Sequence, residues 1–458
     1  MASRRMHRPW KSALRTFSLH SGDISAIDGP LKKLHLPRSP LAAMVAPGST
    51  TMRKTEATSL PLPLIICGSL IAMLTFGPRS SMGFFQLPML QDTGWDRSTF
   101  GLAMALQNLA WGLGQPFFGA LADKYGTARV LILSALLYMA GLMVMAHATA
   151  PLWLHIGGGL LVGLGVAAGS FGIILSAFAR HVTPQQRSLA FGIGTAAGSA
   201  GMFLFAPLSQ ALIAHVGWSD GLTWLGILML LVPLLSYPLR GNAASGKRSA
   251  SEREQTMREA LHEAFGHRSY LLLASGFFVC GFQIAFITAH FPAYLGDIGI
   301  EPRYAVIAMA LIGIFNVVGS LAAGALGQRL PKRLILAAIY LGRSIAVTAF
   351  LLLPQSPVSV VIFAIIMGLF WLSTVPPTNA LVAVMFGTRH LGLLGGLVFL
   401  SHQLGSFLGV WMGGFLYDRM GTYDDVWWFG VGLGLFAALV HLPIREEAAP
   451  QPGTTVQL

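Results

Sequence analysis

Residues 119–129 read GALADKYGTAR, a short polar stretch between two long apolar runs. The run before it covers residues 98–120 and the run after it covers residues 129–148. Each run has about the length that a helix needs to cross a membrane, roughly 20 residues. The first three residues of the stretch return as Gly324-Ala325-Leu326, an offset of 205 (324 − 119). The stretch therefore predicts a loop between spans of an α-helical membrane protein, and its return indicates a duplicated unit.

The composition agrees with a chain that lies mostly in a membrane. Hydrophobic residues make up 54% of the 458 residues and charged residues only 10%, whereas a soluble domain carries about 25% charged residues. The 53 glycines are typical of packed membrane helices, where small residues let backbones approach. The two cysteines, Cys67 and Cys280, lie in apolar runs and suggest neither a disulfide framework nor a metal site. We expect no cofactor.

The positive charge follows the pattern of membrane topology. The net charge is +12, and ten of the 30 Lys and Arg lie within the first 54 residues. Most of the others lie in short segments between apolar runs, without the interleaved aromatic residues of a strand-binding surface. We therefore expect the lipid bilayer, and not nucleic acid, as the partner of this chain.

Twelve apolar runs are long enough to span a bilayer, and they form two groups of six. The first group covers 61–86, 98–120, 129–148, 152–179, 188–214 and 221–240; the second covers 269–295, 304–327, 333–354, 357–386, 391–416 and 425–444. The predicted fold is an all-α membrane protein of twelve transmembrane helices in two pseudo-symmetric six-helix bundles.

Placing both termini in the cytoplasm makes the loop charges agree with the positive-inside rule. Beyond the N-terminal arm, the inside segments then hold fifteen Lys and Arg, and the outside loops hold three, Arg97, Arg303 and Arg419. We expect a multi-pass protein of the bacterial inner (plasma) membrane.

The domain organisation follows from the same runs. Residues 1–59 are basic, contain four prolines after residue 29 and lack an apolar signal-peptide core, so we expect a disordered cytoplasmic arm. Met44 and Met52 are alternative starts, which leaves the native status of residues 1–51 open. The remaining units are a six-helix bundle at 60–240, a cytoplasmic loop at 241–268 with a short surface helix at 252–265, a second bundle at 269–445, and a cytoplasmic tail at 446–458.

Matched residues support duplication of a six-span unit. Gly77 and Gly281 are 204 positions apart (281 − 77), and the same offset relates several other pairs. These pairs are Arg79 and Gln283, Pro88 and Pro292, Gly192 and Gly396, Gly201 and Gly405, and Gly217 and Gly421. Two parallel halves are typical of transporters, whose site lies between the halves near the midplane.

The loop GALADKYGTAR resembles the signature loop between the second and third spans of the major facilitator superfamily. The resemblance covers residues 60–445. Within that superfamily, Arg79-Ser80-Ser81-Met82-Gly83-Phe84-Phe85 resembles the bacterial monocarboxylate-porter-like branch, as do residues 280–286 (CGFQIAF) and 401–406 (SHQLGS). The resemblance implies secondary transport by alternating access, with spans one, four, seven and ten around a central cavity.

The resemblance also implies a gating role for the loop. Its acid would be Asp123, with Lys124 and Arg129 nearby and Gly119 and Gly126 shaping the turn. The second copy departs from the pattern, because Gln328 stands where the acid would be and Pro331 where a glycine would be. Any state-stabilising ion pair should therefore be one-sided. The alternative is a tight turn that only obeys the positive-inside rule.

Two arginines, Arg79 and Arg343, fall within the core of a predicted span, and none of the 18 Asp and Glu does. An intramembrane charge costs on the order of 3 kcal/mol or more and marks a functional site by default. Arg79 follows Pro78, which frees backbone groups in the first span. We expect Arg79 to bind a substrate carboxylate through its planar fork; snorkelling to the outer interface is the alternative. Arg343 lies in a peripheral span, where packing is an equal alternative.

Polar residues complete the candidate substrate site. They are Gln283 and His290, two helical turns apart on one face of the seventh span; His402 in the eleventh; Asn108 in the second; and Thr374 and Thr378 in the tenth. In the tenth span Pro376 and Pro377 indicate a broken helix, whose freed carbonyls and hydroxyls could face substrate. Each has a packing alternative: Asn108 can bond between helices, the prolines can mark a simple kink, and the histidines can bond neighbouring helices. Without intramembrane acids, a coupled proton would ride on His402, His290 or the substrate.

The sequence therefore predicts a secondary transporter of a small organic anion, monocarboxylate-like, with proton coupling, anion exchange and uniport open. The first alternative is an exporter of amphiphilic or drug-like compounds. A transporter-fold sensor or membrane enzyme is an alternative of another class, which lacks support because no HExxH or boundary GxSxG motif is present. We expect no enzyme activity.

Overall fold

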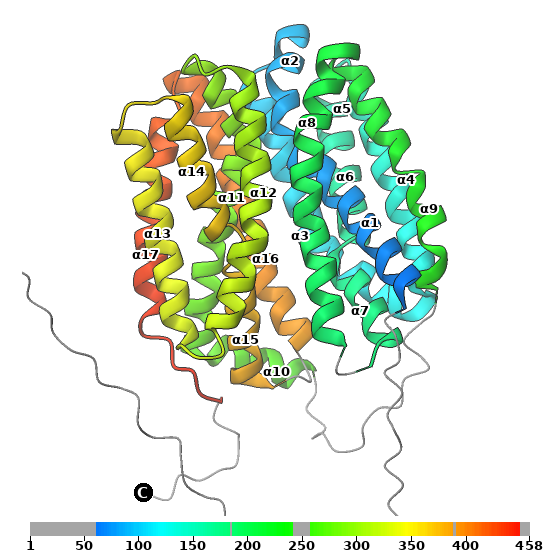
Figure 1. Ribbon diagram of the computed structural model, residues 1–458, viewed down its shortest axis with the longest axis vertical. Helices are drawn as coiled ribbons and strands as arrows, with labels where there is room; N and C mark the ends of the chain where they lie inside the picture. Colours follow the sequence, from blue (N-terminus) through cyan, green and yellow to red (C-terminus); the bar gives the residue numbers. More distant parts are fainter. Residues whose placement is uncertain (1–60, 184–185, 241–256, 388–390, 449–458) are drawn as a thin grey trace, which may run out of the picture. The chain divides into compact units, whose positions relative to one another are not determined.

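The computed structural model describes residues 61–183, 186–240, 257–387 and 391–448 (Figure 1). The expected N-terminal arm, most of the central loop and most of the C-terminal tail lie outside these residues. The described residues belong to one packed unit, so contacts between the two predicted halves are contacts within a single unit.

Every regular element in the described residues is a helix. The first half contains α1 (Leu62–Ser80), α2 (Gly83–Thr93), α3 (Arg97–Tyr125), α4 (Thr127–Ala146), α5 (Pro151–Leu154), the π-helix η1 (His155–Leu161), α6 (Val162–Ala168), α7 (Phe171–His181), α8 (Arg187–Leu228), α9 (Leu231–Leu235) and the 3₁₀-helix η2 (Tyr237–Leu239).

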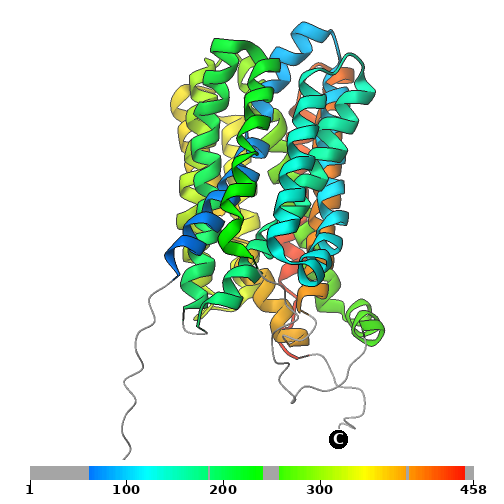
Figure 2. The same cartoon turned by 90° about the vertical axis from the view of Figure 1, so that its right-hand side faces the viewer.

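The second half begins with a short helix at the expected surface position, α10 (Met257–Gly266). It continues with α11 (Arg268–Asp297), α12 (Pro302–Leu326), α13 (Lys332–Leu352), α14 (Pro357–Phe370), α15 (Val375–Phe386), α16 (Leu391–Met420) and α17 (Asp424–His441). Figures 1 and 2 show α10 at the end of the bundle where α7 and α15 lie, opposite the end that carries α2.

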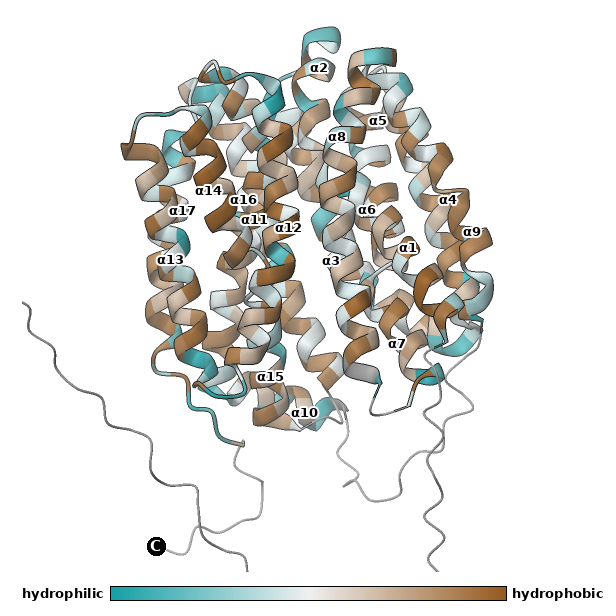
Figure 3. Cartoon of the chain, in the orientation of Figure 1, coloured by the Kyte–Doolittle hydropathy of each residue, from teal (hydrophilic) through white to brown (hydrophobic). Residues whose placement is uncertain are grey.

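The described helices supply twelve spans. Nine segments are long and apolar enough to cross a membrane, and one of them, Leu189–Leu235, breaks at Gly217, whose φ of 85° divides it into two spans. The 29-residue α3 and the 18-residue α17 complete the set. Their hydropathy is lowered by polar residues. In α3, Arg97 bonds to the other half, whereas Gln107 and Asn108 bond within the first half. Apolar residues dominate the middle of the helices and hydrophilic residues gather toward both ends (Figure 3).

The halves meet through three helix pairs that repeat the symmetry of the duplication. Helix α3 packs on α16, α8 on α12, and α2 on α11; Figure 1 shows α8 and α12 side by side between the halves. Each half has its own apolar core, one around Phe100 and Tyr138 and the other around Phe291 and Trp371. The α2–α11 approach is close at Gly83, where a Cβ would lie 2.5 Å from the Thr288 carbonyl oxygen.

Three spans are interrupted. The first span bends between α1 and α2, where Pro78 lies inside the helix. The fourth span contains η1 and breaks between α6 and α7. The tenth span breaks between α14 and α15, next to the two prolines that predicted a broken helix. Such interruptions are tolerated in a membrane where other groups satisfy the freed backbone, and two of them carry the candidate site.

Candidate functional site

Arg79 is held in place at the bend of the first span. Helix α1 ends one residue later, and the hydroxyl of Ser81 donates to the Pro78 carbonyl oxygen at 2.9 Å. The Arg79 guanidinium donates through Nη2 to Oδ1 of Asn108 on α3. Asn108 in turn donates to the Met104 carbonyl oxygen at 2.8 Å, which fixes its amide with the oxygen toward Arg79. The guanidinium carbon lies 4.6 Å from the ring centre of Trp111.

A small cavity between the halves adjoins this arginine. We call it the central cavity; its volume is about 20 Å³. The residues that line it are Arg79, Met82, Met104, Gln107, Asn108, Ala285, Thr288, Ala289 and Val410. They come from α1, α3, α11 and α16, with Met82 between α1 and α2, so both halves contribute. Of these lining residues, Arg79 alone carries a charge, and its Nε–H group has no acceptor in the described part of the chain.

A larger cavity of about 280 Å³ lies elsewhere and is lined by apolar side chains only, from Leu70 on α1 to Leu235 at the end of α9. It offers nothing that could balance the charge of a substrate, so size does not identify the site here.

Gln283 and His290 do not line the central cavity with Arg79. Gln283 donates to the Gly430 carbonyl oxygen of α17 at 2.9 Å and accepts from Arg343 at 3.4 Å. His290 lies two turns further along the same face of α11, where α11 contacts α16 and α2. Thr288, which the sequence did not single out, lies in the cavity wall instead.

His402 packs inside the second half. Its Nδ1 lies 3.1 Å from Oε1 of Gln403, and its ring stacks on Phe399 with centres 5.8 Å apart. Phe399 also meets Trp111 of α3 at 5.1 Å between ring centres. Phe399 therefore lies between His402 and Trp111, the ring that covers Arg79, and His402 does not line the central cavity.

Arg343 occupies the break of the tenth span. Its guanidinium donates to the Phe370 carbonyl oxygen through Nε at 3.1 Å and through Nη2 at 2.6 Å, and also to the Trp371 carbonyl oxygen. These are carbonyls at the C-terminal end of α14, where the helix dipole places about half an elementary negative charge. Arg343 is fully buried, and its charge is balanced by carbonyl oxygens. The freed carbonyls of this break therefore face Arg343.

Thr374 and Thr378 are buried beside that break. The Thr374 hydroxyl lies 3.3 Å from Sγ of Cys280 on α11, whereas the Thr378 hydroxyl has no partner in the described residues. The break is further held by Asn316 of α12, whose Oδ1 accepts from the Leu372 N–H at 2.9 Å. Asn316 also donates to Ser199 of α8 at 2.9 Å, which connects the break to the other half.

The signature loop forms the turn between α3 and α4. Gly126 has φ of 95°, a left-handed conformation that favours glycine. Asp123, Lys124 and Arg129 are exposed, and Gly119 has open space around it. Arg180 of α7 donates to the Thr127 hydroxyl and is attracted by the Asp123 carboxylate. These contacts lie within the first half.

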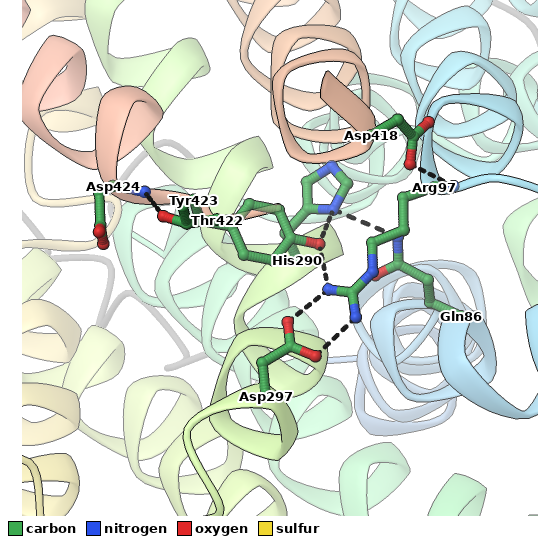
Figure 4. Close-up of polar contacts among 8 residues, drawn as sticks. All are labelled: Gln86, Arg97, His290, Asp297, Asp418, Thr422, Tyr423 and Asp424. Carbon is green, nitrogen blue, oxygen red and sulfur yellow. Dashed lines mark hydrogen bonds and ion pairs between the residues drawn. The ribbon is translucent and has the colours of Figure 1, made fainter. Parts of the chain in front are cut away.

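An ionic contact between the halves was missed by the sequence analysis. We call Arg97, Asp297, Asp418 and Tyr423 the outer cluster, because the topology predicted from the loop charges places this end of the bundle outside (Figure 4). Arg97, at the start of α3, donates to both carboxylate oxygens of Asp297 on α11 at 2.6 Å each and to the Tyr423 hydroxyl at 2.9 Å. Its guanidinium also lies 3.6 Å from the Tyr417 ring centre.

Asp418 of α16 adds a helix cap across the same interface. Its two oxygens accept from the backbone N–H of Arg97 at 3.0 Å and of Ser98 at 2.7 Å, the first residues of α3. A carboxylate is favoured at a helix N-terminus by both the free N–H groups and the dipole. Because the helix belongs to one half and the carboxylate to the other, this cap is lost if the halves separate at this end.

His290 adjoins the outer cluster. Its Nε2 lies 2.8 Å from the Val410 carbonyl oxygen, so in the neutral ring the proton is on Nε2 and Nδ1 accepts. Nδ1 lies 3.1 Å from the Tyr423 hydroxyl and 3.3 Å from Nε2 of Gln86 on α2. Burial raises the pKa of the Tyr423 phenol, so its hydroxyl keeps its proton and donates to His290 while it accepts from Arg97.

Apolar helices of membrane-spanning length, packed in two halves with a charged cavity between them, define an integral, multi-pass membrane protein. A sequence profile of the Major Facilitator Superfamily matches residues 65–409 and 317–457, and the chain belongs to this family. Similar proteins include the uncharacterized MFS-type transporter YcxA of Bacillus subtilis (strain 168), 28% identical over 75% of this chain and 85% of that protein.

The names of other relatives include a substrate. Monocarboxylate transporter 13 of Rattus norvegicus is 25% identical over 76% of this chain and 81% of its own length. The gallate transporter of Pseudomonas putida is 26% identical over 61% of this chain and 69% of its own length. Among solved structures, a bacterial homolog of the lysosomal transporter Spinster shares the fold with a TM-score of 0.69 and 15% identity, covering 84% of this chain and 97% of the homolog.

Proposed function

We propose that this protein is a secondary active transporter of a small organic anion, monocarboxylate-like, which it moves by alternating access between its two halves. The observation that carries the proposal is Arg79. It is the single charge among the described residues of the central cavity wall, and it retains an Nε–H group without an acceptor. A substrate carboxylate would supply the missing acceptor and the counter-charge.

The surroundings of Arg79 suit an anion more than a cation. Asn108 presents its oxygen to the guanidinium and fixes its direction, and Trp111 covers one face. Arginine stays charged at every physiological pH. A cationic amphiphile would meet an uncompensated positive charge, which weighs against the exporter alternative. The names of the monocarboxylate and gallate transporters support the same substrate class.

The outer cluster is our candidate for the gate on the outer side. It joins α3 of the first half to α11 and α16 of the second through a bidentate ion pair and a helix cap, and these contacts would break whenever that end opens. At the opposite end, Asp123 and the signature loop are the candidate gating group. Both termini are assigned to the cytoplasm of a bacterial inner membrane, in keeping with the loop charges.

Proton coupling and anion exchange are both compatible with this site. In the proton-coupled version, the group that carries the proton is His290, His402 or the substrate itself. His290 connects Gln86 of one half to Tyr423 of the other. Gln283, Thr374 and Thr378 lie around the break of the tenth span. They would affect substrate binding indirectly, by fixing the geometry of that break.

The test is uptake of a radiolabelled carboxylate panel into proteoliposomes, with and without an inward proton gradient. Saturable uptake of a monocarboxylate is expected, and stimulation by the gradient would assign symport. If a verified folded protein takes up none of the acids, the organic-anion proposal fails and amphiphile export becomes the function to test.

A further inference from the structure

His290 is a fully buried histidine at the contact between the halves, next to the outer cluster (Figure 4). Its Nε2–H group donates to the Val410 carbonyl oxygen at 2.8 Å. Its Nδ1 faces two donors, the Tyr423 hydroxyl at 3.1 Å and the amide nitrogen of Gln86 at 3.3 Å. Because Arg97 donates to the Tyr423 oxygen, the phenolic hydrogen is available to Nδ1. The ring therefore has no place for a second proton in this arrangement, and it is neutral.

The partners of this imidazole come from both halves. Gln86 on α2 and Arg97 on α3 belong to the first half, whereas Tyr423 belongs to the second half, as His290 does. Separation of the halves at this end takes Gln86 and Arg97 away and leaves the Tyr423 hydroxyl beside the ring. The Tyr423 oxygen then receives no hydrogen bond from Arg97 and is free to accept one from a protonated Nδ1.

The same separation leaves two carboxylates without their partners. Arg97 donates to both oxygens of Asp297 at 2.6 Å, and its backbone N–H donates to Asp418 at 3.0 Å. Both acids stay with His290 in the second half. The Arg97 charge repels a proton on the ring, and the Asp418 carboxylate attracts it. Departure of Arg97 therefore changes the local field from one that opposes a charge on His290 to one that favours it.

The other ionisable groups at these helix ends do not replace the lost cation. Arg419, next to Asp418, is exposed and lies over the Phe415 ring, with its guanidinium carbon 4.2 Å from the ring centre. The helix α2 contributes only the uncharged Gln86. The remaining groups are neutral or acidic, namely Tyr294, Tyr417 and the exposed Asp424.

We propose that His290 takes up a proton from the outside when the outer cluster opens, and that the protonated imidazole replaces Arg97 as the counter-charge of Asp297 and Asp418. The inference rests on the outer cluster being the outer gate of the proposed transporter. One proton moves from external water to Nδ1, and the return of Arg97 on closing expels it. A ligand shifts an equilibrium toward the state that binds it better, so external acid opens this end of the protein.

The test is the distance between the halves at the outer end, measured at several pH values without substrate. Spin labels go on Thr149→Cys and Leu353→Cys, two exposed positions in different halves, in nanodiscs with Cys67→Ser and Cys280→Ser as background. Pulsed electron paramagnetic resonance gives the populations, and unlike a thiol-labelling rate it does not itself depend on pH. With an open-state imidazole near its ordinary pKa of about 6.5, the ratio of open to closed protein should rise about tenfold from about pH 8 to about pH 5.5.

His290→Gln should abolish this rise, because an amide can still donate to the Val410 carbonyl oxygen but does not titrate. The matched control is His215→Gln, which removes an exposed histidine of the outer end and should keep the full rise. Wild-type populations that do not change with pH would overturn the inference, whether or not His290→Gln folds. A full rise in folded His290→Gln would overturn it as well.

Asp297→Asn separates this inference from the proposed gate. If this variant lengthens the distance at constant pH while the wild-type protein shows no response to pH, the outer cluster remains the gate and only the role of His290 is rejected. If neither acid nor Asp297→Asn moves the outer end, both are rejected. Carboxylate uptake tests the proposed transport function independently of either result.

Discussion

Arg79 and Arg343 are both arginines inside spans without a carboxylate beside them, yet their surroundings differ. Arg343 is fully buried and donates to two carbonyl oxygens at the C-terminal end of α14. Arg79 lies at the wall of a cavity between the halves, with one amide oxygen as partner and Nε–H free of an acceptor in the described chain. The charge of Arg343 is balanced by carbonyl oxygens of the fold, and Arg79 is the residue to which we assign the substrate carboxylate.

The difference shows why an intramembrane charge alone does not define a binding site. A helix that breaks inside the membrane releases carbonyls, and a guanidinium from a neighbouring helix can satisfy them, so burial of Arg343 stabilises the break. The two arginines differ in what their donors meet, carbonyl oxygens for Arg343 and a cavity wall for Arg79. Variants of these two residues can therefore separate transport from stability.

The largest expected effect is on transport by Arg79→Gln. Removing one member of a buried, hydrogen-bonded charge pair costs about 2–5 kcal/mol, so carboxylate affinity should fall by about 30-fold or more. Arg79→Lys keeps the charge but loses the planar fork and should also transport poorly. Concentration-dependent uptake measures both, with protein folding checked by gel filtration. Wild-type uptake by Arg79→Lys would remove Arg79 from the substrate site.

The next effect is on stability, by Arg343→Met. This change leaves the carbonyl oxygens of Phe370 and Trp371 without their donor, at about 1–3 kcal/mol for each buried group. The thermal unfolding temperature in detergent should fall clearly, whereas Arg79→Gln should lower it much less. Equal losses of thermal stability in the two variants would contradict the division of roles between these arginines.

Asp297→Asn should shift the balance between the outward-open and outward-closed states. It removes the charge that faces Arg97, and hydrogen bonds to charged groups contribute about 1.5–3 kcal/mol. A reporter Ala289→Cys, placed in the wall of the central cavity, should then react roughly tenfold faster or more with an impermeant thiol reagent added outside. The background carries Cys67→Ser and Cys280→Ser. An unchanged labelling rate would exclude the outer cluster as a gate.

The smallest effect is expected from Asp123→Asn. Its carboxylate is exposed and attracts Arg180 within the same half, and exposed ion pairs contribute about 0–1 kcal/mol. The same reporter should show a change of only a few-fold. A change as large as that of Asp297→Asn would mean that the signature loop controls the equilibrium more strongly than its contacts in this state indicate.

The fold could be predicted because span length, loop charge and the 204-residue offset can be read directly from the sequence, without knowing which helices meet. Arg79 could be singled out as a candidate because an arginine beside a proline inside an apolar run is an intramembrane charge. The break of the tenth span was also visible in Pro376 and Pro377, but the partner of its carbonyls was not, because Arg343 lies on another helix.

The outer cluster could not be predicted, because a single sequence does not show which distant helix ends meet. Arg97, Asp297 and Asp418 look like ordinary charges at the ends of spans, and nothing local says that α3, α11 and α16 meet there. The predicted topology gave one indication, because it places Arg97, Asp297 and Asp418 at the same membrane face. For Thr288 the sequence gives no such signal, because a threonine in an apolar helix is common and does not by itself indicate a cavity.

The most direct test of the central claim is equilibrium binding of a transported radiolabelled carboxylate to purified wild-type, Arg79→Lys and Arg343→Lys proteins in nanodiscs. We predict saturable binding by the wild-type protein, loss of binding by Arg79→Lys, and binding by whatever folded fraction of Arg343→Lys remains. Wild-type affinity in Arg79→Lys, or loss of binding confined to folded Arg343→Lys, would contradict the assignment of the substrate carboxylate to Arg79.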